Sequence, residues 1–219
     1  MKHIFFAFML FCVFSLKAQG VMTLQDKPFV FNRAIDSVLW KEINKEKIFT
    51  SLSQQDQLTF YWTNYFRQNP KRFYNLVIKE FISQFPEANS SELKSLEKDI
   101  LKAPEKLPIL YPEKGLLKMA ALHSSDLVKR GAVISHTSKS GKNFVQRINE
   151  AGTYRCGAEN IYIGSPDPLE ALIALLIDMG VPDKGHRMNL LDPKFGKMGV
   201  SFLIISLKKG LLEQVFACP

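Results

Sequence analysis

Apolar residues recur at spacings of three and four between Gln54 and Phe85, which is the repeat of a helix with one buried face. The stripe has two parts, formed by Trp62, Tyr65 and Phe66, and then by Phe73, Leu76, Val77 and Phe81. Between them, Asn69-Pro70 interrupts the run, because a residue that precedes proline avoids helical backbone angles. The pattern therefore predicts a strongly helical segment with a break at Asn69.

Three further helical segments are predicted in the first two thirds of the chain. Residues 27–47 have the pattern of an irregular lead followed by a helix, and residues 91–101 that of a short charged helix. A proline-punctuated connector over residues 103–112 follows. The next helix is expected from Pro112, which suits a first turn, to Gly131, which suits a C-terminal stop.

One stripe of that helix is formed by Leu116, Ala120, His123 and Leu127. His123 is therefore expected to point inward. A lone histidine on an apolar stripe is more often a hydrogen-bonded core residue than a ligand, so the core role is favoured. The stripe gives the direction of the side chain and leaves open whether His123 joins a functional site.

The last third of the chain predicts a buried helix and then a hairpin. Asp167, Pro168 and Glu170 form an almost complete capping box, and the body over residues 171–177 is apolar nearly all round. Asp178 is expected on the last turn, where a negative charge meets the unfavourable end of the helix dipole, so it hints at function. Residues 199–206 and 211–217 predict two strands of a hairpin.

The start of the chain indicates export. Residues 1–3 are a short basic lead, and residues 4–16 are almost wholly apolar but too short to span a bilayer. Ala18-Gln19-Gly20 fits a small-residue cleavage site, so residues 1–20 are predicted to be a signal peptide; an uncleaved anchor is the alternative. No other segment has the length and apolar character of a membrane span. A secreted or periplasmic protein, not integral to the membrane after cleavage, is expected.

Charge adds little to this prediction. The formal net charge is +8, and removal of Lys2 and Lys17 with the leader leaves +6. Basic and acidic residues are interleaved, for example over residues 33–47, which is typical of a solvated face. No nucleic-acid motif accompanies them, so nucleic acid is not expected as a partner.

Two cysteines remain after the leader, Cys156 and Cys218. In an oxidising compartment an even pair favours a disulfide, and two independent buried thiols are the alternative. A bridge would also tie the segment before Glu159 to the last predicted strand.

Five short motifs follow one another along the chain. They are Leu122-His123-Ser124-Ser125-Asp126-Leu127, Ser135-His136-Thr137-Ser138, Gly157-Ala158-Glu159-Asn160-Ile161, Gly185-His186-Arg187-Met188-Asn189-Leu190-Leu191, and Phe195 to Val200. Each is weak alone, but in this order and spacing the chain resembles the CAP superfamily, and most of all its bacterial exported SCP-like members. The resemblance covers residues 58–219 and implies an α+β fold, an α-β-α sandwich with a central antiparallel sheet. We therefore divide the chain into a signal peptide (1–20), an N-terminal appendage (21–53) and a CAP domain (54–219).

Family members often carry a cleft with two histidines and two acids. The resemblance assigns the histidines to His136 and His186 and one acid to Glu159, and Asp178 falls where the second acid would be. Glu159 and His186 are each expected in a turn that contains glycine and asparagine. The neighbouring motif residues expected to support the site are His123, Asn160, Arg187 and Asn189.

The chain departs from the family pattern at several positions near this site. Ala158 replaces the usual glycine before Glu159, Leu175 takes a tryptophan position, and Asp178 is one methylene shorter than glutamate. Residues 181–184 also form a longer lead before Gly185-His186 than many members have. These departures put the fourth member of the tetrad in doubt.

Three roles stay open for the tetrad. Two imidazoles with a carboxylate can bind a divalent metal such as zinc through His136 and His186, and a metal-bound water could hydrolyse a polar bond. The third role is a buried polar network that fixes three loops. Among functions, we favour an exported binding module for a lipid, glycan or protein ligand. A metal-dependent extracellular hydrolase is the alternative. The sequence identifies neither the ligand nor an activity.

Overall fold

The computed structural model describes residues 27–219, so the predicted signal peptide and the first residues of the expected appendage lie outside the described residues. The helices are α1 (Ser37–Ile43), α2 (Gln54–Gln68), α3 (Pro70–Phe73), α4 (Lys79–Gln84), α5 (Ser91–Lys102), α6 (Lys114–Lys129), α7 (Phe144–Ala151), α8 (Pro168–Ile177) and α9 (Gly185–Leu191). Short 3-10 turns lie at Phe49–Ser51 and Pro86–Ala88, and a π-helical segment, Tyr74–Ile78, joins α3 to α4. The strands are β1 (Tyr111–Pro112), β2 (Gly157–Gly164), β3 (Lys197–Ser206) and β4 (Lys209–Ala217).

The four strands form one sheet in the order β1-β3-β4-β2. The predicted hairpin is β3–β4, and β2 pairs antiparallel with β4 on its other side. The two-residue β1 is the one parallel partner, on β3. Because β4 lies between two strands, its backbone is paired on both sides, and nearly all of its residues are buried.

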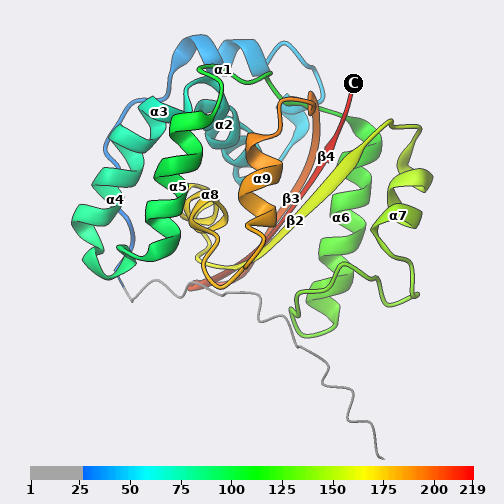
Figure 1. The fold of residues 1–219 in the computed structure, drawn as a ribbon. Helices are drawn as coiled ribbons and strands as arrows, with labels where there is room; N and C mark the ends of the chain where they lie inside the picture. The colour runs from blue at the N-terminus through cyan, green and yellow to red at the C-terminus, as the bar shows by residue number, and fades with distance from the viewer. Residues whose placement is uncertain (1–26) are drawn as a thin grey trace, which may run out of the picture.

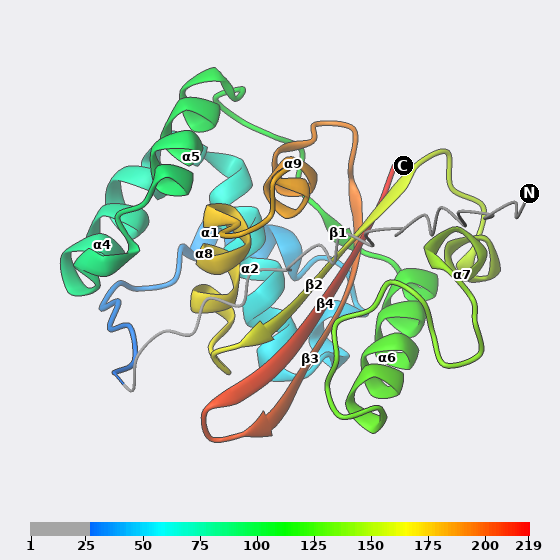
Figure 2. The ribbon, with the colours of Figure 1, turned by 60° about the horizontal axis from the view of Figure 1, so that its bottom comes forward.

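Helices cover both faces of this sheet (Figure 1). The helices α6 and α7 lie on one face, while α1 to α5, α8 and α9 lie on the other (Figure 2). The expected α-β-α sandwich is therefore confirmed, with the α+β class that goes with it.

The period of two along β4 divides its side chains between these layers. Leu212 and Phe216 belong to the large core cluster with α2 and α8. Val215 and Ala217 pack instead with α6 and α7, and Leu211 joins a separate small cluster with Leu127 of α6. Glu213 shares the parity of the α6 side, so it lies between two apolar clusters on that face.

One glycine lets α6 lie close to the sheet. A Cβ on Gly199 of β3 would come within 2.1 Å of the backbone carbonyl carbon of Leu116. Because backbone atoms of a helix cannot move aside as a flexible side chain can, this position requires glycine. The close approach brings the inward stripe of α6 down onto β3 and β4.

Two helix starts depart from the sequence prediction, at Pro112 and at Glu170, while other predicted boundaries agree. Asn69 ends α2 and caps α3 as its break predicts, and Asp167 caps α8. Pro112, however, pairs in β1, and Glu113 caps α6 one residue later. Glu170 does not complete the expected capping box, because its carboxylate accepts the N–H of Phe29 at 2.7 Å.

Residues 27–53, which we expect to be an appendage, contribute to the main core. Leu39, Ile43 and Phe49 are buried in the large cluster, and the rings of Phe29 and Phe31 pack on Phe81 and Trp62 respectively. The boundary at residue 53 remains a prediction, and these contacts attach the segment firmly to the rest of the fold.

A disulfide joins Cys156 to Cys218, with the two Cα atoms 5.3 Å apart. It fastens the start of β2 to the end of β4. Within residues 27–219, no helix is both long and apolar enough to cross a membrane.

Candidate functional site

His136 lies in the loop between α6 and α7 and contacts the buried carboxylate of Glu159. Its Nδ1 is 2.7 Å from Glu159 Oε2. Because an ionised carboxylate only accepts, Nδ1 carries the proton and donates it. Glu159 lies inside strand β2 and not in a turn, which corrects the expectation. The strand holds the carboxylate on the α6 side of the sheet, and the histidine reaches it from the loop.

Arg147 of α7 fixes both members of this first pair. Its guanidinium binds Glu159 through two hydrogen bonds, from Nη1 to Oε1 at 2.7 Å and from Nη2 to Oε2 at 2.9 Å. The same Nη2 donates to the carbonyl of His136 at 3.1 Å. Burial raises the pKa of Glu159, but the hydrogen bonds from His136 and Arg147 outweigh it and lower that pKa to about 2. Glu159 is therefore ionised at neutral pH.

The second pair, Asp178 and His186, has the same contact distance but a different construction. Asp178 Oδ1 accepts from His186 Nδ1 at 2.7 Å, and its Oδ2 accepts the backbone N–H of His186 at 3.0 Å and of Arg187 at 3.2 Å. Asp178 was expected on the last turn of α8, and it is instead the left-handed residue that ends it, with φ of 56°. This conformation turns the carboxylate away from the end of α8 and onto the first N–H groups of α9.

The two pairs are joined across strand β2. Asn189 of α9 donates to Asn160 Oδ1 at 2.8 Å, and Asn160 donates to the carbonyl of His186 at 3.3 Å. Asn160 follows Glu159 in the strand and points to the opposite face, where it also donates to Gln214 of β4 at 3.2 Å. Asn160 and Asn189 therefore hold α9 against β2, the strand that carries Glu159.

Arg187, the third expected supporting residue, is fully buried and acts on α8. Its Nε and Nη2 donate to the carbonyls of Leu176 and Ile177 at 2.7 and 2.8 Å, and its Nη1 donates to Asp99 of α5 at 2.8 Å. A cation that satisfies the last carbonyls of a helix stabilises its C-terminal end. Arg187 thus fixes the end of α8 where Asp178 turns.

Both histidine rings keep their second nitrogen available. Nδ1 is used in each pair, and no hydrogen bond within residues 27–219 engages Nε2 of either ring. The side chain of His136 is 44% exposed and that of His186 15% exposed. A histidine whose Nδ1–H donates to a carboxylate presents a neutral, more basic Nε2, which is the form that binds a metal or accepts a proton.

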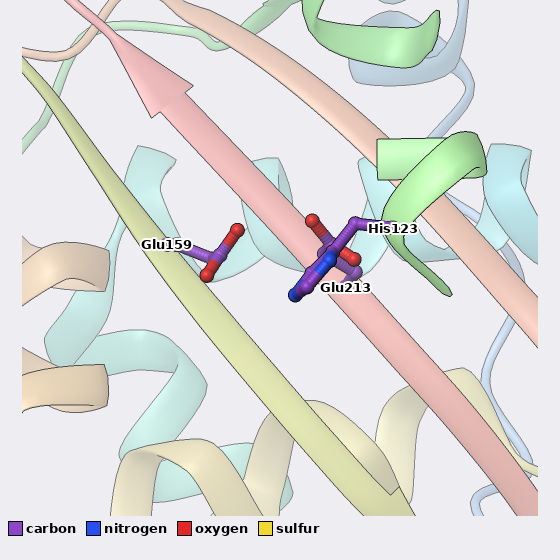
Figure 3. A group of neighbouring side chains, drawn as sticks. All are labelled: His123, Glu159 and Glu213. Carbon is purple, nitrogen blue, oxygen red and sulfur yellow. The ribbon is translucent and has the colours of Figure 1, made fainter. Parts of the chain in front are cut away.

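His123 is buried and belongs to a cluster with Glu159 and Glu213. Its Nε2 contacts the carbonyl oxygen of Ser135 at 2.8 Å, so the expected core role accounts for one ring nitrogen. Burial lowers the pKa of His123, which keeps the ring neutral. Figure 3 shows its ring beside the carboxylates of Glu159 and Glu213, which come from β2 and β4. Burial, and then the charge of Glu159, raises the pKa of Glu213.

Sequence reasoning missed three buried charged residues. Arg147 lies on a helix whose capping box, Asn143 with Gln146, was itself a readable signal. Glu213 is an acid among the mostly apolar residues of β4, which is a second such signal. Arg67 donates from α2 to the carbonyls of Pro108, Leu190, Asp192 and Phe195, at distances of 2.9 to 3.0 Å. Nothing in the sequence indicated that Arg67, a long charged side chain on a helix, would bind the carbonyls of those loops.

The fold has likenesses among solved structures. They include an extracellular protein containing a SCP domain from Bacillus anthracis (22% identity, TM-score 0.47, 75% of this chain and 40% of that chain). An outer surface protein from Borrelia burgdorferi matches at 20% identity and a TM-score of 0.44, over 59% of this chain and 93% of that one. Venom allergen-like protein 4 of Schistosoma mansoni matches at 11% identity and a TM-score of 0.44, over 77% and 91%. This chain thus spans less than half of the Bacillus anthracis chain.

Among curated proteins, none matches this sequence. The family model described as the cysteine-rich secretory protein family, CAP, matches residues 60–213, which is well over half of the chain. That range includes all four members of the two histidine–acid pairs. The chain therefore belongs to the cysteine-rich secretory protein (CAP) family.

Proposed function

We propose that this protein is an exported CAP-domain binding module whose two histidines hold a divalent metal and so present a site to an extracellular ligand or partner. The main support for the proposal is that the two histidine rings have the same hydrogen-bonding pattern. Each donates its Nδ1–H to a carboxylate at 2.7 Å, and Nε2 has no partner within the described residues.

The donor chemistry of the pairs fits zinc. Zinc is bound by neutral imidazole nitrogens, and carboxylates behind metal-binding histidines fix the tautomer and raise the basicity of the ligand nitrogen. His136 and His186 would supply the ligands, while Glu159 and Asp178 would orient them. A bound metal would supply an open position for a ligand group or a water molecule.

Export supports the same proposal. The apolar segment of residues 4–16 and the cleavage-like Ala18-Gln19-Gly20 precede the described residues, and a disulfide between Cys156 and Cys218 suits an oxidising compartment. A lipid, a glycan or a protein segment remains the proposed class of ligand.

Zinc titration calorimetry on the metal-free protein without residues 1–20 tests the metal site. We expect His136 and His186 to bind one equivalent at micromolar affinity or tighter, and this equivalent to be lost in a His136→Ala/His186→Ala variant. Glu159→Gln and Asp178→Asn leave both ligand rings in place and should each weaken binding about 10–100-fold. A double histidine variant that binds as many equivalents as the wild-type protein would refute the assignment.

The same double variant separates the module from a hydrolase. Binding of a ligand identified from lipid or glycan panels by the wild-type protein, with no turnover in either protein, supports the module. Turnover of a peptide or polymer that the variant loses would overturn it in favour of a metal-dependent hydrolase.

A further inference from the structure

The cluster of His123, Glu159 and Glu213 is buried on the α6 face of the sheet, between two apolar clusters. One ligand-type atom from each side chain lies within 4.8 Å of the other two. The side chains converge from three different elements (Figure 3). Glu159 and Glu213 are diagonal neighbours, because Glu159 pairs with Val215 and Glu213 with Ile161.

Three buried atoms of this cluster that could bind a metal accept no hydrogen bond within the described residues. They are Nδ1 of His123 and, while Glu213 is ionised, both of its carboxylate oxygens. Glu159 Oε1 accepts one hydrogen bond, from Arg147, so a lone pair remains on it. Buried polar atoms without partners cost free energy, so three of them meeting in one small region indicate a missing partner.

Charge indicates what that partner is. If Glu213 were ionised like Glu159, the two carboxylates and the guanidinium of Arg147 would leave one excess negative charge in the interior. Arg147 Nη1 is 2.7 Å from Glu159 but 3.6 Å from Glu213, beyond hydrogen-bond distance. An isolated buried carboxylate is costly unless it binds a proton or a cation. The carboxylate of Glu213 should therefore bind either a proton or a cation.

We propose that His123, Glu159 and Glu213 form a buried site for a divalent transition metal, distinct from the His136/His186 site. One imidazole nitrogen and two carboxylates suit zinc, cobalt or manganese, whereas magnesium and calcium prefer oxygen ligands alone. Nε2 of His123 contacts the Ser135 carbonyl and therefore carries the proton, which leaves a lone pair on Nδ1 for a metal. Arg147 orients Glu159 in the same way that hydrogen bonds orient other metal-binding carboxylates.

A groove reaches this cluster at His123, whereas Glu159 and Glu213 are not among the residues that line it. A cavity of about 690 Å³ opens between α6 and α7, and His123 and Arg147 are among the residues that line it. His136 and His186 do not line the cavity, so the buried site and the proposed surface site have separate approaches.

The test uses zinc calorimetry in a background that lacks the surface site. We expect two equivalents in the wild-type protein, one in His136→Ala/His186→Ala, and none when Glu213→Gln is added to that variant. Glu150→Gln, on the exposed part of α7, is the matched control and should leave the remaining equivalent in place. A remaining equivalent that persists after Glu213→Gln would overturn the proposal.

A second measurement does not depend on the folding of the Glu213 variant. In His136→Ala/His186→Ala without residues 1–20, His123 is the single histidine of the chain. Its ring nitrogen resonances, followed by NMR, should shift at Nδ1 and saturate at one equivalent of zinc. Unchanged resonances at excess zinc would show that a proton neutralises the cluster and that the metal site does not exist. If the surface histidines fail to bind zinc but this shift occurs, the proposed function fails and the buried site stands.

Discussion

The two histidine–acid pairs have equal contact distances, but different forces hold their acids in place. Glu159 is held by a buried guanidinium, which contributes charge, whereas Asp178 is held by two backbone N–H groups at the start of α9. The first arrangement depends on Arg147, which lies on another helix, and the second depends on the left-handed conformation of Asp178. The same distance between histidine Nδ1 and a carboxylate oxygen can therefore be held either by a long-range ion pair or by a local backbone turn.

This difference predicts unequal sensitivity of the two pairs. Removing a cation from a buried pair leaves an uncompensated charge, while removing the side chain of Asp178 leaves neutral N–H groups, which cost less to bury than a charge does. The first pair should thus tolerate substitution less well than the second.

Arg147→Met should have the largest effect. It leaves Glu159 and Glu213 buried without their cation, so the free energy of unfolding should fall by about 3–5 kcal/mol in urea denaturation. Lys142→Met removes the exposed partner of Glu150 and is the matched control, with an expected loss below about 1 kcal/mol. Equal losses in the two variants would contradict the assigned role of Arg147.

Replacement of both Cys156 and Cys218 by alanine should rank second. The disulfide closes a loop with a sequence separation of 62, and its removal should cost about 4 kcal/mol on the chain-entropy model. Because the bridge fastens the strand that carries Glu159, native-state hydrogen exchange should speed up more in β2 than at the start of α9. Uniform acceleration in both regions would show that the two pairs are not supported separately.

Acidic pH should weaken the first pair through Glu159. The groups that face it are His136, Arg147 and Glu213, and the net result is a folded-state pKa of about 2. A lowered pKa means that the stability is present above the unfolded value near 4.5 and is lost as the pH falls from there toward 2. The loss should be on the order of 3 kcal/mol. Denaturation of the metal-free wild type and of Glu159→Gln across this range measures it, and identical pH dependence in the two proteins would refute the assignment.

Asp178→Ala should have the smallest effect of the four. It removes three hydrogen bonds and places alanine in a left-handed conformation, at a cost of about 2–3 kcal/mol. Asp178→Asn keeps an acceptor and a residue that tolerates this conformation, so about 1 kcal/mol is expected. Thermal denaturation of both variants checks the order, and an asparagine variant as unstable as the alanine variant would argue against the turn.

The sequence predicted the helices and strands of the fold better than it predicted the local structure of the candidate site. The apolar stripes over residues 54–85 and 112–131 and the hairpin near the C-terminus all agree with the structure, because local periodicity records which face is buried. The turn expected around Glu159 is wrong, since Gly157 and Asn160 are paired in a strand. Pairing with β4 overrides the local preference of glycine and asparagine for turns.

The sequence by itself determined most of the helices, the hairpin, the inward direction of His123 and the motifs that the family shares. Only the tertiary structure decided that Arg147 meets Glu159, that Glu213 lies beside both of them, and that Asp178 turns onto α9. The physical reason is that periodicity fixes the face on which a side chain lies, whereas its charge partner depends on strand order and register. Those are set by backbone pairing between β2 and β4, which lie far apart in the chain.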